Sequence, residues 1–214
     1  MAGVVVHAVT SLDGFIADPH DEVGPLFDWY FNGDVELLGG HGGWRFQVGA
    51  ASYAHVDGFW RSCGAMVIGR RLFDLTNGWN GVPSVGDRVF VVTHEAPTDW
   101  VPSAELSAPD APFTFVTTGV ADAIAQAVEV AGDRTVAVAA GDVGGQAVRA
   151  GLVDEVAIDL VPVFLGSGKP YLGGAVGAEG PVLLEDPHVV VRGDRVLHLV
   201  HRVGSRHPAV TSAR

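Results

Sequence analysis

The stretch TVAVAAGDVGGQAVRAGLVDEVAIDLVPVFLGSGKP, residues 135–170, constrains the fold more than any other part of the chain. It predicts a buried strand over 136–140, a turn at Gly141, a short helix, a second strand and a glycine loop at 166–170. The free amides at the start of that helix carry the positive end of its dipole, which suits a phosphate or pyrophosphate. An ordinary strand-to-helix turn has the same pattern, so this stretch alone leaves both interpretations open.

The composition indicates a globular protein with a sizeable core. The chain has 214 residues, of which 48% are hydrophobic and 18% charged. Its net charge of -12, from 25 acidic and 13 basic residues, repels nucleic acid and anionic membrane surfaces. Cys63 is the only cysteine, which excludes an intrachain disulfide, and no apolar run approaches the length of a membrane span. We therefore expect a cytoplasmic protein that binds neither nucleic acid nor membranes.

Strand and helix patterns alternate along most of the chain. The pattern predicts strands over 4–10, 65–68, 88–93 and 113–117 and helices over 50–61, 70–75 and 120–131. Such alternation implies right-handed crossovers and a mostly parallel central sheet. Strands expected over 182–185, 189–192 and 196–203, with a turn at Gly193-Asp194, would close the sheet as an antiparallel hairpin. We expect one α/β domain over 1–204 and a flexible tail over 205–214.

The segment 18–49 differs in composition from its surroundings. It contains two prolines, the aromatic cluster Phe27, Trp29, Tyr30 and Phe31, and a glycine run at 39–43. We interpret it as a long loop with a short helix. Loops of this length in a compact domain are usually functional, so the segment is expected to form a lid or a subunit contact.

Groups that bind anions follow three of the expected strands. The Gly69-Arg70-Arg71 turn offers amides and two guanidinium groups, Thr93 adds a hydroxyl, and Gly141 begins the glycine turn. Each is also compatible with a solvated helix start or a plain turn. Ligands of open α/β sheets collect at the carboxyl ends of strands, so the three together favour a phosphate-binding crevice.

Four further side chains are candidates for substrate chemistry. Ser11 and Asp13 end the first strand, where a carboxylate could bond a heterocycle or relay a proton, although Ser-x-Asp-Gly is also ordinary turn chemistry. His7 shares the strand face of Ser11 and could point into the same pocket, or be a buried histidine bonded to backbone. Asp57 could be an acid or merely an exposed helical residue.

Motifs for several other chemistries are absent from the sequence. There is no G-x-G-x-x-G, no G-x-S-x-G and no H-E-x-x-H, and His198 and His201 would lie on opposite faces of a strand. We expect no metal site.

Four motifs, taken in order, resemble the reductase domain of bacterial riboflavin biosynthesis proteins, a family with the dihydrofolate reductase fold. They are SLDGFIA at 11–17, VIGRR at 67–71, the glycine turn at 141–146, and GLVDE at 151–155 followed by VPVFLGSG at 161–168. The segment 18–49 falls outside the resemblance. No zinc ligands of the deaminase domain that often accompanies this reductase are present.

The resemblance implies a three-layer α/β/α fold, a homodimer and NADPH as the hydride donor. By this analogy Ser11 and Asp13 face the substrate, with His7 and Asp57 as further substrate-binding candidates. The cofactor would contact residues at the strand ends: Val9 and Ile16 beside the nicotinamide, Gly69, Arg70 and Arg71 near the phosphates, Thr93 near the adenosine, and Gly141, Val143, Gly144, Gly145 and Gln146 against the pyrophosphate.

The predicted function is hydride transfer from NADPH to a small heterocyclic or ribosyl substrate, similar to that of 5-amino-6-(5-phosphoribosylamino)uracil reductase. Asp142 departs from the family pattern, since it places a negative charge beside the expected pyrophosphate. A non-catalytic nucleotide-binding or dimerisation module on the same fold is therefore one alternative. Dihydrofolate reductase is another, although the carboxylate that serves the pterin in that enzyme falls near Tyr53 here.

Overall fold

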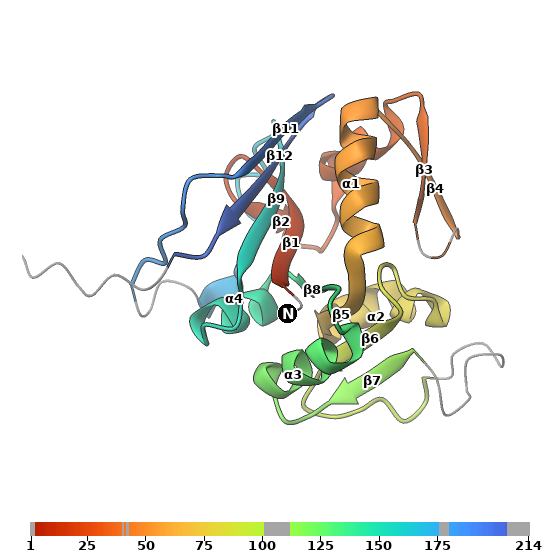
Figure 1. The fold of residues 1–214 in the computed structure, drawn as a ribbon, viewed down its shortest axis with the longest axis vertical. Helices are drawn as coiled ribbons and strands as arrows, with labels where there is room; N and C mark the ends of the chain where they lie inside the picture. Colours follow the sequence, from red (N-terminus) through yellow and green to blue (C-terminus); the bar gives the residue numbers. More distant parts are fainter. Residues whose placement is uncertain (1–2, 40, 42, 101–111, 176–179, 205–214) are drawn as a thin grey trace, which may run out of the picture.

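The computed structural model describes residues 3–39, 41, 43–100, 112–175 and 180–204. An eight-stranded sheet forms its centre, with the strand order β11-β12-β9-β1-β8-β5-β6-β7 (Figure 1). Six of these strands are parallel: β1 (Val4–Ser11), β5 (Cys63–Gly69), β6 (Arg88–Val92), β7 (Phe113–Val116), β8 (Thr135–Ala139) and β9 (Glu155–Val161). The hairpin of β11 (Val189–Gly193) and β12 (Val196–Arg202) pairs antiparallel with β9. The predicted parallel sheet with an antiparallel C-terminal hairpin is confirmed.

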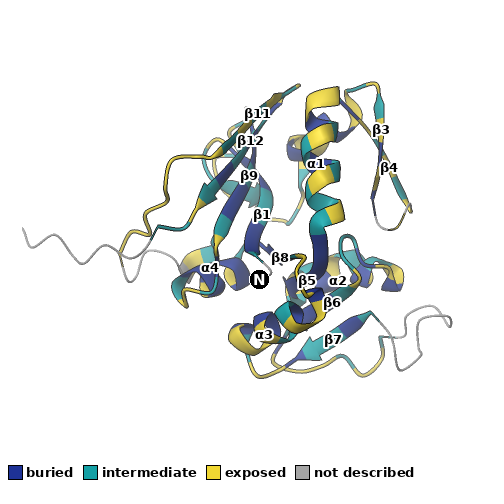
Figure 2. Ribbon diagram, in the orientation of Figure 1, coloured by how far each residue is buried: buried dark blue, intermediate teal, exposed yellow. Residues whose placement is uncertain are grey.

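Helices cover both faces of this sheet. Val67 of β5 packs in a cluster with α3 (Val120–Ala131) and α4 (Asp142–Arg149), whereas its neighbour Ile68 packs with Phe73 of α2 (Arg70–Thr76) on the other face. Helix α1 (Ala50–Ser62) lies on the same face as α2, over the half of the sheet that contains β11. Figure 2 shows the exposed outer side of α1 and the buried strands. The expected three layers are therefore present.

Helix α3 shows why the sequence folds this way locally. Its buried residues recur at helical spacing: Val120, Ala123, Ile124, Ala127 and Ala131. They pack against valines of the central strands, and burial of a side chain such as Ile124 contributes about 1.5–3 kcal/mol.

The segment 18–49 is more ordered than the sequence indicated. A 3₁₀ helix, η1 (Gly24–Phe31), is followed by an antiparallel hairpin of β3 (Val35–Gly39) and β4 (Trp44–Val48) beside α1. The interpretation as a loop with one short helix was wrong about the hairpin. Leu37 and Val48 are buried while their neighbours are exposed or half-buried, which is the period-two pattern of a strand. The glycine run that indicated a loop joins the two strands.

The expected strand over 182–185 was also wrong. Only Leu184 forms an isolated bridge, to Val203, and Val182 to Leu184 are exposed. A short antiparallel pair of β2 (Phe15–Ala17) and β10 (Lys169–Pro170) was not anticipated. Two further short helices among the described residues are η3 (Asn77–Gly81) and η4 (Gly173–Ala175). The predicted tail, 205–214, lies outside the described residues.

Candidate functional site

A cleft of about 1580 Å³ opens at the carboxyl ends of the parallel strands. Val9 of β1, Gly69 of β5, Thr93 after β6 and Gly141 after β8 all line it. Adjacent parallel strands bring these residues together from positions far apart in the sequence. The three strand ends that were expected to form one crevice do form one.

One end of the cleft, here called the arginine end, is built from the starts of α2 and α4 and the segment after β6. Arg70 Nη1 donates to the carbonyl of Glu95 at 2.9 Å, and its Nε donates to Asp74 Oδ1 at 2.8 Å. Arg71 forms two hydrogen bonds with the carboxylate of Asp21, its Nε donating to Oδ1 at 2.8 Å. The Arg71 guanidinium also holds the pKa of Asp21 below its usual range. Both arginines line the cleft and already contact an acidic side chain.

The glycine turn contributes to the arginine end through only some of its residues. Gly141 has a φ of 82°, which favours glycine, and a Cβ there would meet only Ile16, at 3.7 Å. Gly141, Val143 and Gln146 line the cleft together with Ile16. Gly141 thus adds no side chain to the cleft, and its amide donates to the Tyr171 carbonyl at 2.6 Å.

Gly144 and Gly145 are buried away from the cleft lining. A Cβ on Gly145 would lie 2.0 Å from the carbonyl oxygen of Leu172, and one on Gly144 would lie 2.9 Å from that of Ala139. These two glycines therefore allow α4 to pack closely against its neighbours. The adjacent Asp142 lines the cleft, and its Oδ1 accepts a hydrogen bond from the Gly174 amide at 3.4 Å.

Ser11 and Asp13 form a turn network outside the cleft lining. Ser11 Oγ donates to Asp13 Oδ1 at 2.6 Å and accepts from the Phe15 amide at 3.0 Å. Asp13 also accepts from the amides of Leu165, at 3.1 Å, and Gly166, at 2.7 Å. The Ser11 hydroxyl is the main cause that lowers the pKa of the Asp13 carboxyl. The SLDG and VPVFLGSG motifs therefore meet in space, and Asp13 anchors the loop after β9.

Asp57 also lies apart from the cleft lining. It is on α1 and pairs with Arg61 one turn later, with a 2.8 Å hydrogen bond from Arg61 Nε to Asp57 Oδ2. Oppositely charged residues four positions apart commonly pair in this way on the exposed face of a helix. The substrate-facing roles of Ser11, Asp13 and Asp57 stay predictions, and the geometry gives each of them a structural contact.

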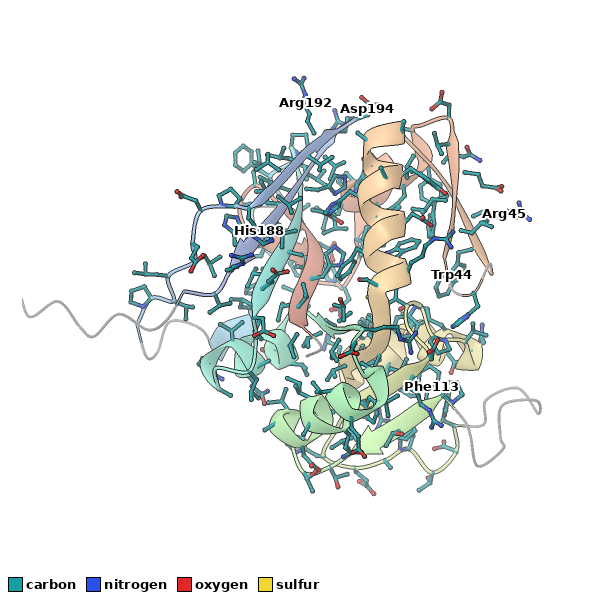
Figure 3. The ribbon with its side chains drawn as sticks, in the orientation of Figure 1. Trp44, Arg45, Phe113, His188, Arg192 and Asp194 are labelled. Atoms are coloured by element: carbon teal, nitrogen blue, oxygen red, sulfur yellow. The ribbon has the colours of Figure 1, made fainter. Side chains whose placement is uncertain are left out.

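The opposite end of the cleft, here called the histidine end, is walled by aromatic side chains. Phe27, Tyr30, Trp44 and Phe46 come from the segment 18–49, and Phe59 and Trp60 come from α1. Tyr30 packs against Phe46 with ring centroids 4.9 Å apart. Figure 3 shows Trp44 at the end of the hairpin, where its ring lies 6.5 Å from that of Trp79. The segment expected to form a lid or subunit contact thus supplies a wall of the cleft.

His7 lies on the floor of the histidine end and contacts a buried polar cluster. Its Nε2 is 3.0 Å from Asp159 Oδ2, and Asp159 Oδ1 is 2.6 Å from His198 Nδ1. His198 Nε2 is in turn 3.0 Å from Ser52 Oγ. Burial alone would raise the pKa of Asp159, but His7 and His198 outweigh burial and hold the pKa well below its usual range.

The cluster has the residue types of a metal site. Ligand atoms of His55, Asp159 and His198 lie within 4.8 Å of one another. Both nitrogens of His198 are, however, already at hydrogen-bonding distance from Asp159 and Ser52. The contacts are those of a hydrogen-bonded network.

A family model for the RibD C-terminal domain matches residues 2–198. The chain belongs to this family. The resemblance stated from the sequence motifs is confirmed, and the matched range spans the segment 18–49. Membership in the RibD C-terminal domain family supports an oxidoreductase activity. No curated protein matches the chain at a significant level.

Solved structures of RibD-type reductases share the fold. A putative riboflavin biosynthesis protein from Shewanella sp. PV-4 superposes with a TM-score of 0.67 at 20% identity, over 96% of this chain and 100% of that chain. The riboflavin biosynthesis reductase Rib7 of Saccharomyces cerevisiae gives 0.56 at 14% identity, over 95% and 90%. The deaminase/5-amino-6-(5-phosphoribosylamino)uracil reductase of Thermotoga maritima gives 0.60 at 14% identity, over 95% of this chain and 57% of that larger protein.

Among the described residues of this RibD C-terminal family member, no helix is long and apolar enough to cross a membrane. The cytoplasmic location expected from the sequence stays a prediction.

Sequence reasoning missed Asp159, His198 and Ser52. One signal was available for two of them. Asp159 interrupts the apolar strand sequence EVAIDLV and His198 interrupts VLHLV, and polar residues in such positions are buried and need partners. Which partners they have follows from strand register, since Asp159 is directly opposite His198 on β12 and lies beside β1.

Proposed function

We propose that this protein is an NADPH-dependent reductase that transfers a hydride to a small heterocyclic or ribosyl substrate. The observation that carries the proposal is the single cleft that joins the arginine end to an aromatic-walled end across the sheet. One end has the chemistry for phosphate groups and the other has flat apolar walls for a ring.

The residues of the arginine end fit a nicotinamide dinucleotide. Gly141 adds no side chain to the cleft, and the guanidinium groups of Arg70 and Arg71 can each present a fork to phosphate oxygens. Val9 and Ile16 would flank the nicotinamide. Thr93, which lines the cleft between β6 and the arginines, would lie toward the adenosine. When bound, the cofactor would supply the hydride, while the chain orients it and excludes water.

The proposal is tested first by binding. Titration with NADPH should quench tryptophan fluorescence and raise the melting temperature, because five tryptophans are present and at least three line the cleft. Absence of any response at millimolar NADPH or NADH would overturn the proposal.

The arginine pair gives a sharper test. Arg71→Ala should weaken NADPH binding by about tenfold or more and NADH binding much less, since a guanidinium that contacts the extra phosphate loses a charge-assisted bond. Arg45→Ala is the matched control, because Arg45 lies exposed on the hairpin and pairs with Glu36 (Figure 3). Equal losses for NADPH and NADH would contradict the placement of Arg71 near that phosphate.

Candidate substrates can be tested by measuring how fast the protein consumes NADPH in their presence. We propose 5-amino-6-(5-phosphoribosylamino)uracil as the first compound to test, since a neighbouring structure is named for its reduction. Dihydrofolate is the comparison compound, and its turnover in place of the uracil compound would favour the dihydrofolate reductase alternative.

A non-catalytic nucleotide-binding module is a second candidate, favoured by one observation. Asp142 and Asp21 both place carboxylates in the arginine end. If they have abolished catalysis by weakening the cofactor site, Asp142→Gly should raise NADPH affinity strongly while no acceptor is reduced. Measurable turnover by the wild-type protein would exclude this candidate.

We also propose a homodimer. Strand β11 is an edge of the sheet, and Val190 on it and Leu183 near it are 58% and 65% exposed. An exposed apolar strand edge is normally covered by another chain or element. Light scattering at micromolar concentration should give twice the monomer mass, and a monomeric mass would contradict the proposal.

A further inference from the structure

Asp159 is a buried carboxylate that the proposed binding sites do not use. Its side chain is 2% exposed and lies in the middle of β9. An ionised carboxylate in such a place requires a cationic or strongly hydrogen-bonding partner. Two imidazoles, of His198 and His7, contact its two oxygens.

His198 uses both of its ring nitrogens inside this cluster. Its Nδ1–H can donate to Asp159 while its Nε2 accepts from the Ser52 hydroxyl, which uses both nitrogens. His55, whose ring centroid is 4.8 Å from that of His198, lies outside the cleft lining, and burial lowers its pKa. His7 is the imidazole of this cluster that lines the cleft.

His7 faces the cleft with one nitrogen unused. Its Nε2 contacts Asp159, and within the described part of the chain its Nδ1 has no hydrogen-bond partner. The ring of Phe59 lies 5.1 Å away, within the range over which an aromatic ring attracts a cation. Tyr30, on the cleft wall, stays neutral because burial raises its pKa well above the usual value.

We propose that His7 is the proton donor of the reduction, positioned by its contact with Asp159, which is itself held by His198 and Ser52. This inference rests on the proposed reductase function and moves the proton source from Asp13, whose oxygens are occupied by Ser11 and two amides. Histidine is suited to donate a proton in catalysis because its charge changes near neutral pH.

The step balances for a C=O or C=N group of the substrate. A bound reduced nicotinamide would supply the hydride for the new C–H bond and would be oxidised. The π electrons of the double bond move to the oxygen or nitrogen, which takes the proton from His7 Nδ1 and forms the O–H or N–H bond. His7 is left neutral, with its Nε2–H on Asp159, and regains a proton from solvent when the product leaves.

The kinetic test compares two His→Gln variants in the full chain. With NADPH and 5-amino-6-(5-phosphoribosylamino)uracil, His7→Gln should lower kcat by about 100-fold while the Kd of NADPH is unchanged. His201→Gln is the control, since His201 is on β12 outside the cleft lining and its Nδ1 lies 2.9 Å from the carbonyl oxygen of Glu185. An unchanged kcat in His7→Gln would overturn the proposal.

A spectroscopic test needs no substrate. In ¹⁵N-labelled protein at neutral pH, the imidazole signals of His7, assigned by their loss in His7→Gln, should show both ring nitrogens protonated. Asp159→Asn should shift them to a neutral ring. A neutral His7 in the wild-type spectrum overturns the proposal even if Asp159→Asn fails to fold. Failure of the wild-type protein to bind NADPH would instead overturn the reductase function, so the two failures are distinguishable.

Discussion

At the arginine end of the cleft, the side chains of Arg70 and Arg71 reach solvent and pair with the carboxylates of Asp74 and Asp21. At the histidine end, a carboxylate is buried between two imidazoles and behind a wall of aromatic rings. Arg71 is 65% exposed, whereas His198 is fully buried. Ion pairs in water contribute little to stability, but breaking a buried pair leaves an unpaired charge. The arginines can therefore exchange their carboxylate partners for a ligand. At the histidine end, the buried network can hold the His7 side chain in one orientation.

The largest expected difference between the two ends is in stability. Asp159→Ala should lower the free energy of unfolding by about 3–5 kcal/mol, because the histidines of a buried network lose their partner. Asp74→Ala, which removes the exposed partner of Arg70, should change it by less than about 0.5 kcal/mol. Urea unfolding of both variants measures the contrast, and similar losses would show that the two ends do not differ in this way.

A second prediction concerns the glycines of the turn. Gly145→Ala should destabilise the protein by about 1–3 kcal/mol, since its Cβ would meet the Leu172 carbonyl at 2.0 Å. Gly58→Ala, on α1, meets nothing within 4 Å and should stabilise the helix by about 0.5–1 kcal/mol. If Gly145→Ala lost NADPH affinity without losing stability, the glycine would serve the ligand and not the packing of α4.

A smaller effect is expected from the contact between Asp21 and Arg71. Asp21→Asn should raise NADPH affinity by about threefold at low ionic strength, because it frees the guanidinium of Arg71 for a phosphate. The gain should fade as salt is added. Calorimetric titration at two salt concentrations measures it, and a loss of affinity would mean that Asp21 positions Arg71 for the cofactor.

The smallest expected effect is the dependence of stability on pH that comes from Asp13. The pKa of Asp13 is lower in the folded protein than in the unfolded chain. Its contribution to stability is therefore fully present above the unfolded pKa and is lost as the pH falls through the folded pKa. Ser11→Ala removes the main cause of the lowered pKa. The stability difference between Ser11→Ala and wild type should therefore shrink on going from neutral pH to about pH 3, which lies below the unfolded aspartate pKa of about 3.9. A difference that is constant with pH would assign the effect to the Ser11–Phe15 contact instead.

Much of the fold was predictable because its signals are local. The valine-rich strands and the spacing of α3 are set by neighbours within one element, and these elements form as expected. The β3–β4 hairpin was missed because the glycine run around its turn has the composition of a loop. The strand expected at 182–185 was wrong because apolar composition alone does not provide a pairing partner.

The sequence by itself determined the family, the parallel sheet with its antiparallel hairpin, and the strand-end groups of the arginine end, since each is a motif in contiguous residues. Only the tertiary structure decided that Asp13 bonds the loop at 165–166, that Gly144 and Gly145 pack against backbone, and that His7 meets Asp159. The contacts of Asp13 and His7 join residues more than 100 positions apart. The contacts at Gly144 and Gly145 depend on how closely α4 approaches its neighbours. Strand register and helix packing bring them together, and neither is written in any one stretch of the chain.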